Sequence, residues 1–159
     1  MENEDFLQYF YERKDKAERL YKSHPQIYNP YLECEVVLNS DGFHHLQFTA
    51  RSERDKKAQL LKFSLLPLAF EVIKKSGTLQ EYRKGLMIVN KRGIRDGLSL
   101  TKFVDYWGFA AIVGQTQIKI KVVLKRVGDG KVIFWSVMPY SKLRNNSRQK
   151  LYVDGIEEE

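Results

Sequence analysis

The residues from Gln115 to Pro139 alternate between apolar and charged side chains, and this pattern organises the predicted fold. The alternating positions are Ile118, Ile120, Val122 and Leu124 on one side and Lys119, Lys121, Val123 and Lys125 on the other. A period of two is typical of a strand with one buried face. The turn-forming residues Gly128, Asp129 and Gly130 follow, and 131–138 is rich in β-branched and aromatic residues. The pattern predicts a β-hairpin with an apolar face and a lysine face.

The register of this hairpin depends on the length of its turn. A two-residue turn at 129–130 sets the pairs Lys121–Met138, Val122–Val137, Val123–Ser136, Leu124–Trp135 and Lys125–Phe134. A three-residue turn at 128–130 moves the pairing by one residue and places Trp135 on the lysine face. We prefer the two-residue turn because it buries Ile133, Trp135 and Val137 together.

Two helices are predicted from apolar residues that recur on one helical face. The first covers 3–22, with Asn3 as its N-cap, and Ser23-His24-Pro25 ends it because the residue before proline avoids the helical region. The second covers 55–75 and is mostly buried. Pro67 should kink this helix or restart it as a new first turn, and Gly77 ends it.

The remaining segments are shorter. Residues 26–30 read as a connector, and 32–38 as a strand that turns at 39–42 into a return strand at 43–50. This second hairpin would place His44 on an apolar face and His45 on a polar face. A short helical turn is predicted at 78–84, a short strand at 86–89, a basic loop at 90–97 carrying Lys91, Arg92 and Arg95, and a strand at 102–113 with a bulge at Gly108.

Helices come early in the chain and strands come late, which indicates an α+β fold. We expect N-terminal helices packed on a mainly antiparallel sheet of about four to six strands. The whole chain, 1–159, is expected to form a single domain. It would have a helical N-terminal part at about 1–30, an α+β body at about 31–140 and a polar C-terminal tail at about 141–159.

Composition narrows the classes of partner. Lys and Arg number 27 against 20 Asp and Glu, a formal net charge of +7, which favours a polyanionic partner such as nucleic acid. The single cysteine, Cys34, excludes an intrachain disulfide and a cysteine-rich metal site. The N-terminal residues lack a secretion signal and no apolar run has the length of a membrane span. We expect a cytoplasmic protein with no membrane partner, no metal and no cofactor.

His45 is the candidate proton carrier, because a histidine on an open polar face can exchange protons near neutral pH. The alternative is a surface histidine without a role. The basic cluster after it, Arg51, Arg54, Lys56 and Lys57, could contact phosphates, or could be a solvated helix start. Arg83 could clamp a phosphate through two hydrogen bonds, or could form a surface salt bridge.

The lysine face of the main hairpin mixes cations with aromatic residues. Lys119, Lys121, Lys125 and Arg126 lie near Phe134, Trp135 and Ser136. Such a surface suits single-stranded nucleic acid, whose bases stack on rings while lysines follow the backbone. The alternative places both aromatic side chains in the core and the lysines in solvent, and for Trp135 we favour the core.

Common enzyme motifs are absent from the sequence. It contains no GxGxxG before a helix, no Walker loop, no GxSxG and no HExxH. Its acidic residues are scattered, without a cluster suited to two-metal chemistry. An enzyme acting on nucleic acid would therefore fit a metal-free mechanism best.

Several of these segments together resemble a known nuclease superfamily. GFHHLQF, RSERDKK, QLLKFSLLPLAFEVI, QEYRK and the late block VVLKRVGDGKVIFWSVMP are similar to segments of barnase–EndoU–colicin–RelE-like (BECR) nucleases of phages and mobile elements, over 36–139. The resemblance implies helices on an antiparallel sheet and RNA cleavage without metal. It maps a catalytic set to His45, Arg54, Arg83, Lys125 and Ser136. The Glu–His pair of the barnase branch has no counterpart, so the identity of the base stays open.

The resulting expectation is a toxin-like endoribonuclease that acts on single-stranded RNA. His45 would take the 2′-hydroxyl proton or protonate the leaving oxygen, and the product would be a 2′,3′-cyclic phosphate. Arg51, Lys57, Lys119, Lys121, Arg126 and Phe134 would bind the nucleic acid, and a cognate antitoxin or immunity protein could be a partner. Two alternatives remain: a non-catalytic nucleic-acid-binding module on the same basic face, and a protein-interaction partner in a toxin–antitoxin or phage system.

Overall fold

The computed structural model describes residues 3–88, 101–115 and 117–140, which form three helices and a six-stranded sheet. The elements are α1 (Glu4–Lys22), β1 (Gln26–Asn29), β2 (Cys34–Val37), α2 (Ser40–Gln47), α3 (Lys56–Lys75), β3 (Glu81–Ile88), β4 (Thr101–Val113), β5 (Ile118–Val127) and β6 (Ile133–Pro139). The strand order is β1-β2-β6-β5-β4-β3, and every neighbouring pair is antiparallel except β2 with β6. The predicted α+β class is confirmed.

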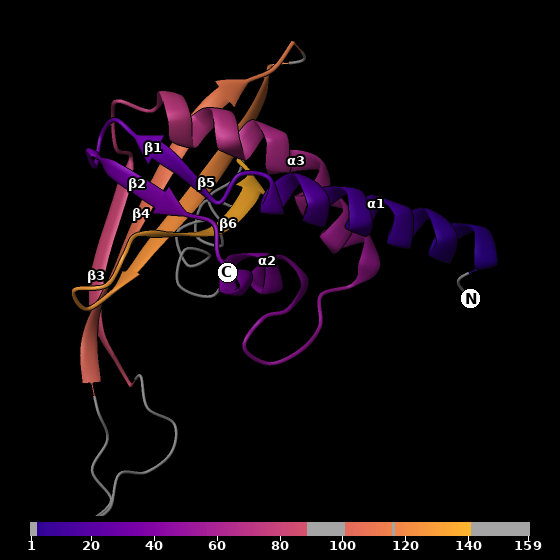
Figure 1. The fold of residues 1–159 in the computed structure, drawn as a ribbon, viewed down its shortest axis with the longest axis horizontal. Helices are drawn as coiled ribbons and strands as arrows, with labels where there is room; N and C mark the ends of the chain where they lie inside the picture. The colour runs from indigo at the N-terminus through magenta and orange to yellow at the C-terminus, as the bar shows by residue number, and fades with distance from the viewer. Residues whose placement is uncertain (1–2, 89–100, 116, 141–159) are drawn as a thin grey trace, which may run out of the picture.

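The helices gather on one face of the sheet. α3 lies across this face and α1 packs along α3, while α2 lies below them beside β6 (Figure 1). The main hydrophobic core fills the space between these helices and the sheet, and a smaller cluster of Val104, Tyr106, Val123 and Met138 lies on the other face. None of the described helices is both long and apolar enough to span a membrane.

Two helix starts follow the sequence prediction. The Oδ1 atom of Asn3 accepts a hydrogen bond from the backbone N–H of Phe6 at 2.7 Å, and Asp55 accepts one from Ala58 at 2.8 Å. Each cap satisfies a backbone N–H that has no partner within its helix. α3 continues through Pro67 as one helix, so the predicted restart at this residue does not occur.

The predicted return strand at 43–50 is wrong, because these residues form most of helix α2. Asn39 caps the helix by accepting a hydrogen bond from the N–H of Gly42 at 3.1 Å, and Asp41 lies in the first turn. Asn and Asp suit a helix N-terminus as well as a turn, so the local sequence fits both structures. β2 instead pairs with β1, which lies in the segment predicted to be a connector.

The predicted helical turn at 78–84 is also wrong, because β3 begins at Glu81 and pairs with β4 along its whole length. Gly108 does not form a bulge, since the register of β4 is continuous on both sides of it. Its role is close packing: a Cβ atom at this position would lie 3.2 Å from the Cβ of Glu81. The predicted loop at 90–97 lies outside the described residues.

The central hairpin of β5 and β6 combines both predicted registers. Lys121, Val122 and Val123 pair with Met138, Val137 and Ser136, as the two-residue turn predicts. Leu124 then pairs with Phe134 instead of Trp135, and the register shifts between Val123 and Leu124. Trp135 is the extra residue of a β-bulge. The predicted placement of Trp135 in the main core, which follows from a two-residue turn, is therefore wrong. Near the turn, the observed pairing is the one predicted for a three-residue turn.

Gly42 fixes the distance between α2 and its neighbours. A Cβ atom at this position would collide with the backbone oxygen of Phe134 and lie 2.6 Å from the Oη of Tyr21. Tyr21 donates a hydrogen bond from this Oη to the backbone oxygen of Asn39, the N-cap of α2. The missing side chain thus allows α2 to approach both β6 and the end of α1.

Replacing Gly42 with alanine should destabilise the protein, although alanine usually stabilises a helix by roughly 0.5–1 kcal/mol over glycine. Overpacking of this kind lowers the free energy of unfolding by about 1–3 kcal/mol, which urea unfolding would measure. Gly85→Ala is the control, because a Cβ atom at Gly85 meets nothing within 4 Å. Equal stability of the two variants would contradict the close packing of α2.

Candidate active site around Trp135

The bulged residue Trp135 lies at the centre of a group of basic side chains. The imidazole of His45 on α2 stacks on the indole, with 4.0 Å between ring centroids and 24° between ring planes. The Nζ atom of Lys125 on β5 lies 3.7 Å from the centroid of the same indole and 5.6 Å from that of Tyr106. Contacts between a cation and an aromatic ring are attractive, and more so when water is excluded.

The free edge of β6, which is the part beyond its single pair Val37–Ile133 with β2, is bonded by side chains rather than by a strand. The backbone oxygen of Trp135 lies 3.2 Å from His45 Nδ1, and that of Val137 accepts a hydrogen bond from Lys62 Nζ at 2.9 Å. Residues two apart on a strand direct their carbonyls the same way, so α2 and α3 each supply a partner for this edge. Because a carbonyl only accepts, Nδ1 of His45 carries a proton, and Nε2 keeps a lone pair while the ring is neutral.

His45 is neutral at pH 7 in this environment. Burial lowers the pKa of His45 to about 3, and the positive charges of Arg54 and Lys62 act in the same direction. The pKa of the Lys125 amine is also lowered by burial, and the carboxylate of Asp41 partly offsets this effect. The field around His45 is therefore cationic, and its ring does not add a further charge.

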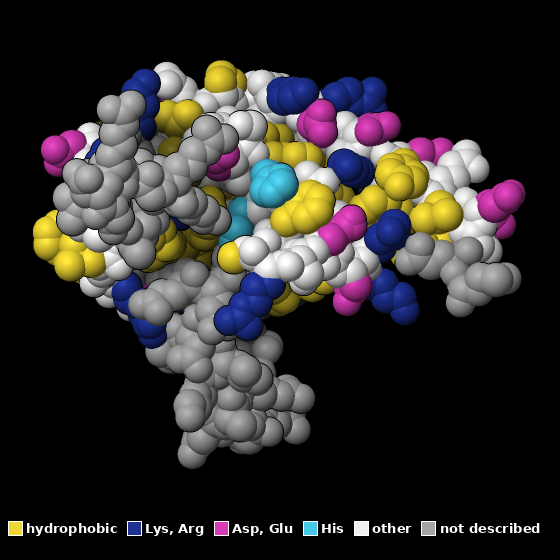
Figure 2. All heavy atoms as spheres, turned by 90° about the horizontal axis from the view of Figure 1, so that it is seen from below, with side chains coloured by type: hydrophobic (Ala, Val, Ile, Leu, Met, Phe, Trp, Pro, Cys, Tyr) yellow, Lys and Arg dark blue, Asp and Glu magenta, His cyan; other side chains and the backbone are white. Residues whose placement is uncertain are grey.

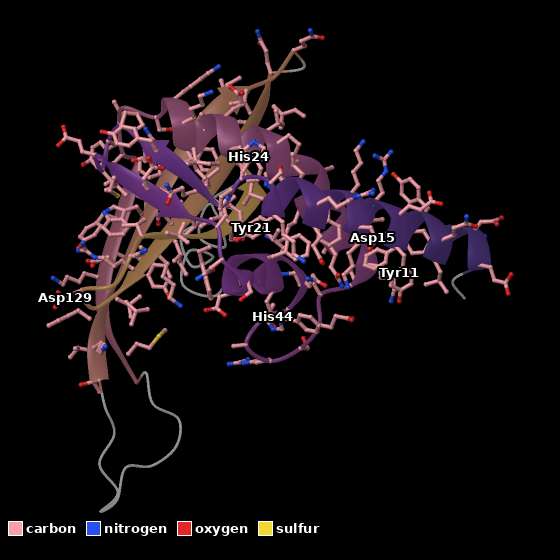
Figure 3. The ribbon with its side chains drawn as sticks, viewed as in Figure 1. Tyr11, Asp15, Tyr21, His24, His44 and Asp129 are labelled. Carbon is pink, nitrogen blue, oxygen red and sulfur yellow. The ribbon has the colours of Figure 1, made fainter. Side chains whose placement is uncertain are left out.

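The predicted placement of the two neighbouring histidines is reversed. His45 was expected on an open polar face, but only 7% of its surface is exposed. His44 was expected to be packed, yet it is exposed on α2 and stacks on Phe48 with 4.5 Å between ring centroids (Figure 3). The reversal follows from the helix, in which His45 shares a buried face with Gly42, Phe43 and Leu46. On the face seen from below, an exposed histidine side chain lies next to hydrophobic side chains (Figure 2).

The structure brings two further predicted catalytic residues near this group. Arg54 donates a hydrogen bond from Nε to the backbone oxygen of His45 at 3.1 Å. Ser136 follows Trp135 on β6, is fully buried, and accepts a hydrogen bond from Lys62 Nζ at 3.2 Å. Ser136 thus contacts the basic group from inside the protein and is not open to solvent.

Arg83, the fifth predicted catalytic residue, lies farther along the same face. It pairs with Tyr106 across β3 and β4, and Tyr106 pairs with Lys125 across β4 and β5. Two strand spacings separate Arg83 from Lys125, about 10 Å between their backbones. Arg83 Nε lies 3.6 Å from Glu81 Oε1, within the ion-pair distance.

The predicted nucleic-acid-binding residues divide into two groups. Arg51 and Lys57 are exposed near the start of α3, and Lys119 is half-buried with its Nζ 4.2 Å from the ring centroid of Tyr140. The other three residues do not share an exposed surface with these lysines, because two are buried and one lies on the opposite face. These residues are Lys121, Arg126 and Phe134.

Lys121 is only 1% exposed and pairs with Glu81 Oε2 at 2.8 Å. Arg126 points to the opposite face from the lysines, because it is the next residue after Lys125 on β5, and it pairs with Asp105 at 3.0 Å. Phe134 is fully buried in the main core, where its ring packs against Tyr21 at 6.0 Å between centroids. The side chain of Tyr21 lies between α1 and α2 (Figure 3).

Sequence reasoning missed Lys62 and the role of Trp135. Lys62 is buried on α3 among apolar residues, although it is a lysine. A signal for it was present, since Gln59, Lys62, Phe63 and Leu66 share one helical face by their spacing. For Trp135 no such signal exists, because both hairpin registers give acceptable apolar pairs. The indole Nε1–H of Trp135 is buried without a hydrogen-bond partner among the described residues.

Comparison with known proteins found no matching protein-family model, no similar curated protein and no similar solved structure. Among the described residues, no group of three or more histidine, cysteine, aspartate or glutamate side chains is arranged to hold a metal ion. The functional argument therefore depends on the contacts and charges of this chain.

The low pKa of His45 predicts a pH-dependent stability. The unfolded chain takes up a proton below pH 6.5, whereas folded His45 stays neutral down to about pH 3. The stability linked to this residue is fully present above pH 6.5 and is lost as the pH falls, at roughly 1.4 kcal/mol per pH unit. Urea unfolding of the wild type and His45→Gln between pH 6.5 and 4.5 should show this difference in slope.

His44→Gln is the matched control and should keep the wild-type slope, because the ring of His44 is exposed in the folded protein. Parallel pH profiles for the wild type and His45→Gln would show that His45 is not held neutral by the fold.

Proposed function

We propose that the protein is an endoribonuclease that cleaves RNA without a metal ion at the cationic group around Trp135. The observation that carries the proposal is the buried indole N–H of Trp135, which has no hydrogen-bond partner within the described part of the chain and lies beside Lys125 and His45. A buried donor without a partner is rare in proteins and calls for an acceptor. A phosphate oxygen is an acceptor that the surrounding cations would also attract.

Lys125 is the proposed proton carrier. Burial lowers the pKa of its amine, so the neutral form with a lone pair becomes more accessible near neutral pH. The amine removes the proton from the ribose 2′-hydroxyl, and the 2′-oxygen attacks the adjacent phosphorus. The bond from phosphorus to the 5′-oxygen breaks, and this oxygen leaves as a hydroxyl by taking a proton from water, while the Lys125 ammonium returns its proton to solvent. The products are a 2′,3′-cyclic phosphate and a 5′-hydroxyl end.

The neighbouring residues supply charge and orientation. The positive field of Arg54 and Lys62, which already acts on His45, would stabilise the negative charge that develops on the phosphate. A pKa of about 3 makes His45 a weak base at neutral pH, so the proposal moves proton transfer from His45 to Lys125. His45 is a positioning residue, since its stacking and its Nδ1–H hold Trp135 in place.

Replacing Lys125 with methionine should lower RNA cleavage by about 100-fold or more, the usual contribution of a proton-transfer group. The assay uses labelled RNA and a matched single-stranded DNA in excess chelator, and RNA alone should be cut. The wild-type rate should rise with pH, with a midpoint below 10.5, and Lys125→Met should lose this dependence. Lys74→Met is the control, because this exposed lysine lies in the last turn of α3 and its loss changes the net charge equally.

Two results would overturn the proposal. Wild-type cleavage by Lys125→Met would remove Lys125 from the reaction. Equal cleavage of RNA and DNA would exclude attack by the 2′-hydroxyl, since DNA lacks this group.

The second candidate is a nucleic-acid-binding protein that uses the same face without cleavage. The observation in its favour is the burial of the reactive groups, with Lys125 only 9% exposed and His45 only 7% exposed. It predicts RNA affinity that falls steeply with salt, because binding releases counterions, and no strand cleavage at any pH.

A further inference from the structure

A small hollow lies between β3 and β4, on the face of the sheet opposite the described helices. Its volume is about 190 Å³, and its lining residues are Arg83, Gly85, Leu86, Met87, Val104 and Tyr106. Arg83, Gly85 and Met87 alternate along β3 and therefore share one face. Val104 and Tyr106 lie opposite Gly85 and Arg83 on β4. The hollow exists because Gly85 has no side chain between two long ones.

The chemistry of the lining suits a flat, partly apolar group with hydrogen-bond acceptors. Gly85 and Val104 form an apolar floor, and the ring of Tyr106 and the thioether of Met87 border it. Arg83 brings a guanidinium, which has five donors and no acceptor. Ligand pockets for whole small molecules usually measure about 300–1,000 Å³, so this hollow has room for a single base rather than a complete nucleotide.

The hollow adjoins the cationic group through one residue. Tyr106 borders the hollow, and its ring centroid lies 5.6 Å from the Nζ of Lys125. Arg83 and Lys125 are about 10 Å apart across two strand spacings. A nucleic-acid strand with one phosphate at Lys125 could therefore place a neighbouring base over Gly85.

We propose that the hollow over Gly85 is a base-binding subsite that takes guanine from the bound nucleic acid. Guanine presents two acceptors on one edge, O6 and N7, which match the paired donors of a guanidinium. Adenine offers one acceptor and one donor there, and cytosine offers a donor, so Arg83 discriminates against both. The assumption that the base belongs to an RNA strand rests on the proposed function. The binding of guanine in the hollow does not depend on it.

Gly85→Leu tests the subsite by filling it. The fold should tolerate this change, because a Cβ atom at Gly85 meets nothing within 4 Å, and thermal unfolding will check it. NMR titration with guanosine, adenosine and cytidine monophosphates and with inorganic phosphate measures binding without cleavage. The wild type should bind the guanosine nucleotide about tenfold more tightly than the cytidine nucleotide, the scale of one well-formed pair of hydrogen bonds. Gly85→Leu should lose this preference and bind inorganic phosphate as the wild type does.

Arg83→Lys separates charge from geometry. The lysine keeps the positive charge but lacks the planar pair of donors, so the preference for guanosine over cytidine should disappear while a general affinity for nucleotides remains. Equal affinity of the wild type for all three nucleotides, or an unchanged guanosine preference in Gly85→Leu, would overturn the subsite.

Failure of the subsite and failure of the cleavage reaction give different results. If Lys125→Met and the wild type are both inactive on RNA but the guanosine preference is present and depends on Gly85, the subsite stands and the nuclease proposal falls. If RNA is cut but the wild type shows no guanosine preference, the nuclease proposal stands and the subsite falls.

Discussion

The β-bulge at Trp135 decides what each face of the central hairpin carries. In a regular strand, neighbouring side chains point to opposite faces, so Trp135 and Ser136 could not both leave the main core. The extra residue lets Phe134 pack against Tyr21 in that core while Trp135 joins Lys125 on the other face. Ser136 still pairs with Val123 on that second face. A single irregularity thus separates the residues that stabilise the sheet from those that surround the candidate site.

The free edge of β6 links this arrangement to the helices. An unpaired strand edge exposes carbonyls that need donors, and a buried carbonyl without one is unfavourable. His45 and Lys62 supply these donors from α2 and α3, so both polar side chains become buried for a structural reason. Lys62 then adds its positive charge to those of Arg54 and Lys125 in the field that acts on neutral His45 beside Trp135. The stability of the edge and the character of the site depend on the same side chains, and a substitution at either one changes both.

Much of the fold could be predicted from sequence where a local pattern allows only one structure. The alternation of β5 and the cap at Asn3 are of this kind. The segment after Asn39 is different, because its residues suit a turn and a helix N-terminus equally well, and only packing against Tyr21 and Phe134 selects the helix. The sequence identifies His45 as a candidate residue but not its buried surroundings. The strand period of two places His45 on an exposed face, whereas these residues form a helix. The bulge could not be predicted, because both registers bury apolar pairs.

The low pKa of His45 has a consequence for how such a site binds anions. Burial and the positive charges of Arg54, Lys62 and Lys125 disfavour a second proton on the imidazole, so the ring stays neutral while its Nδ1–H still donates to Trp135. A fourth positive charge would increase the repulsion in the empty site and oppose folding. An anion bound beside Trp135 would reduce this repulsion and raise the pKa values of both His45 and Lys125. Binding would therefore favour the protonated forms, so the neutral Lys125 amine that the proposed reaction needs would form in the complex as the pH rises.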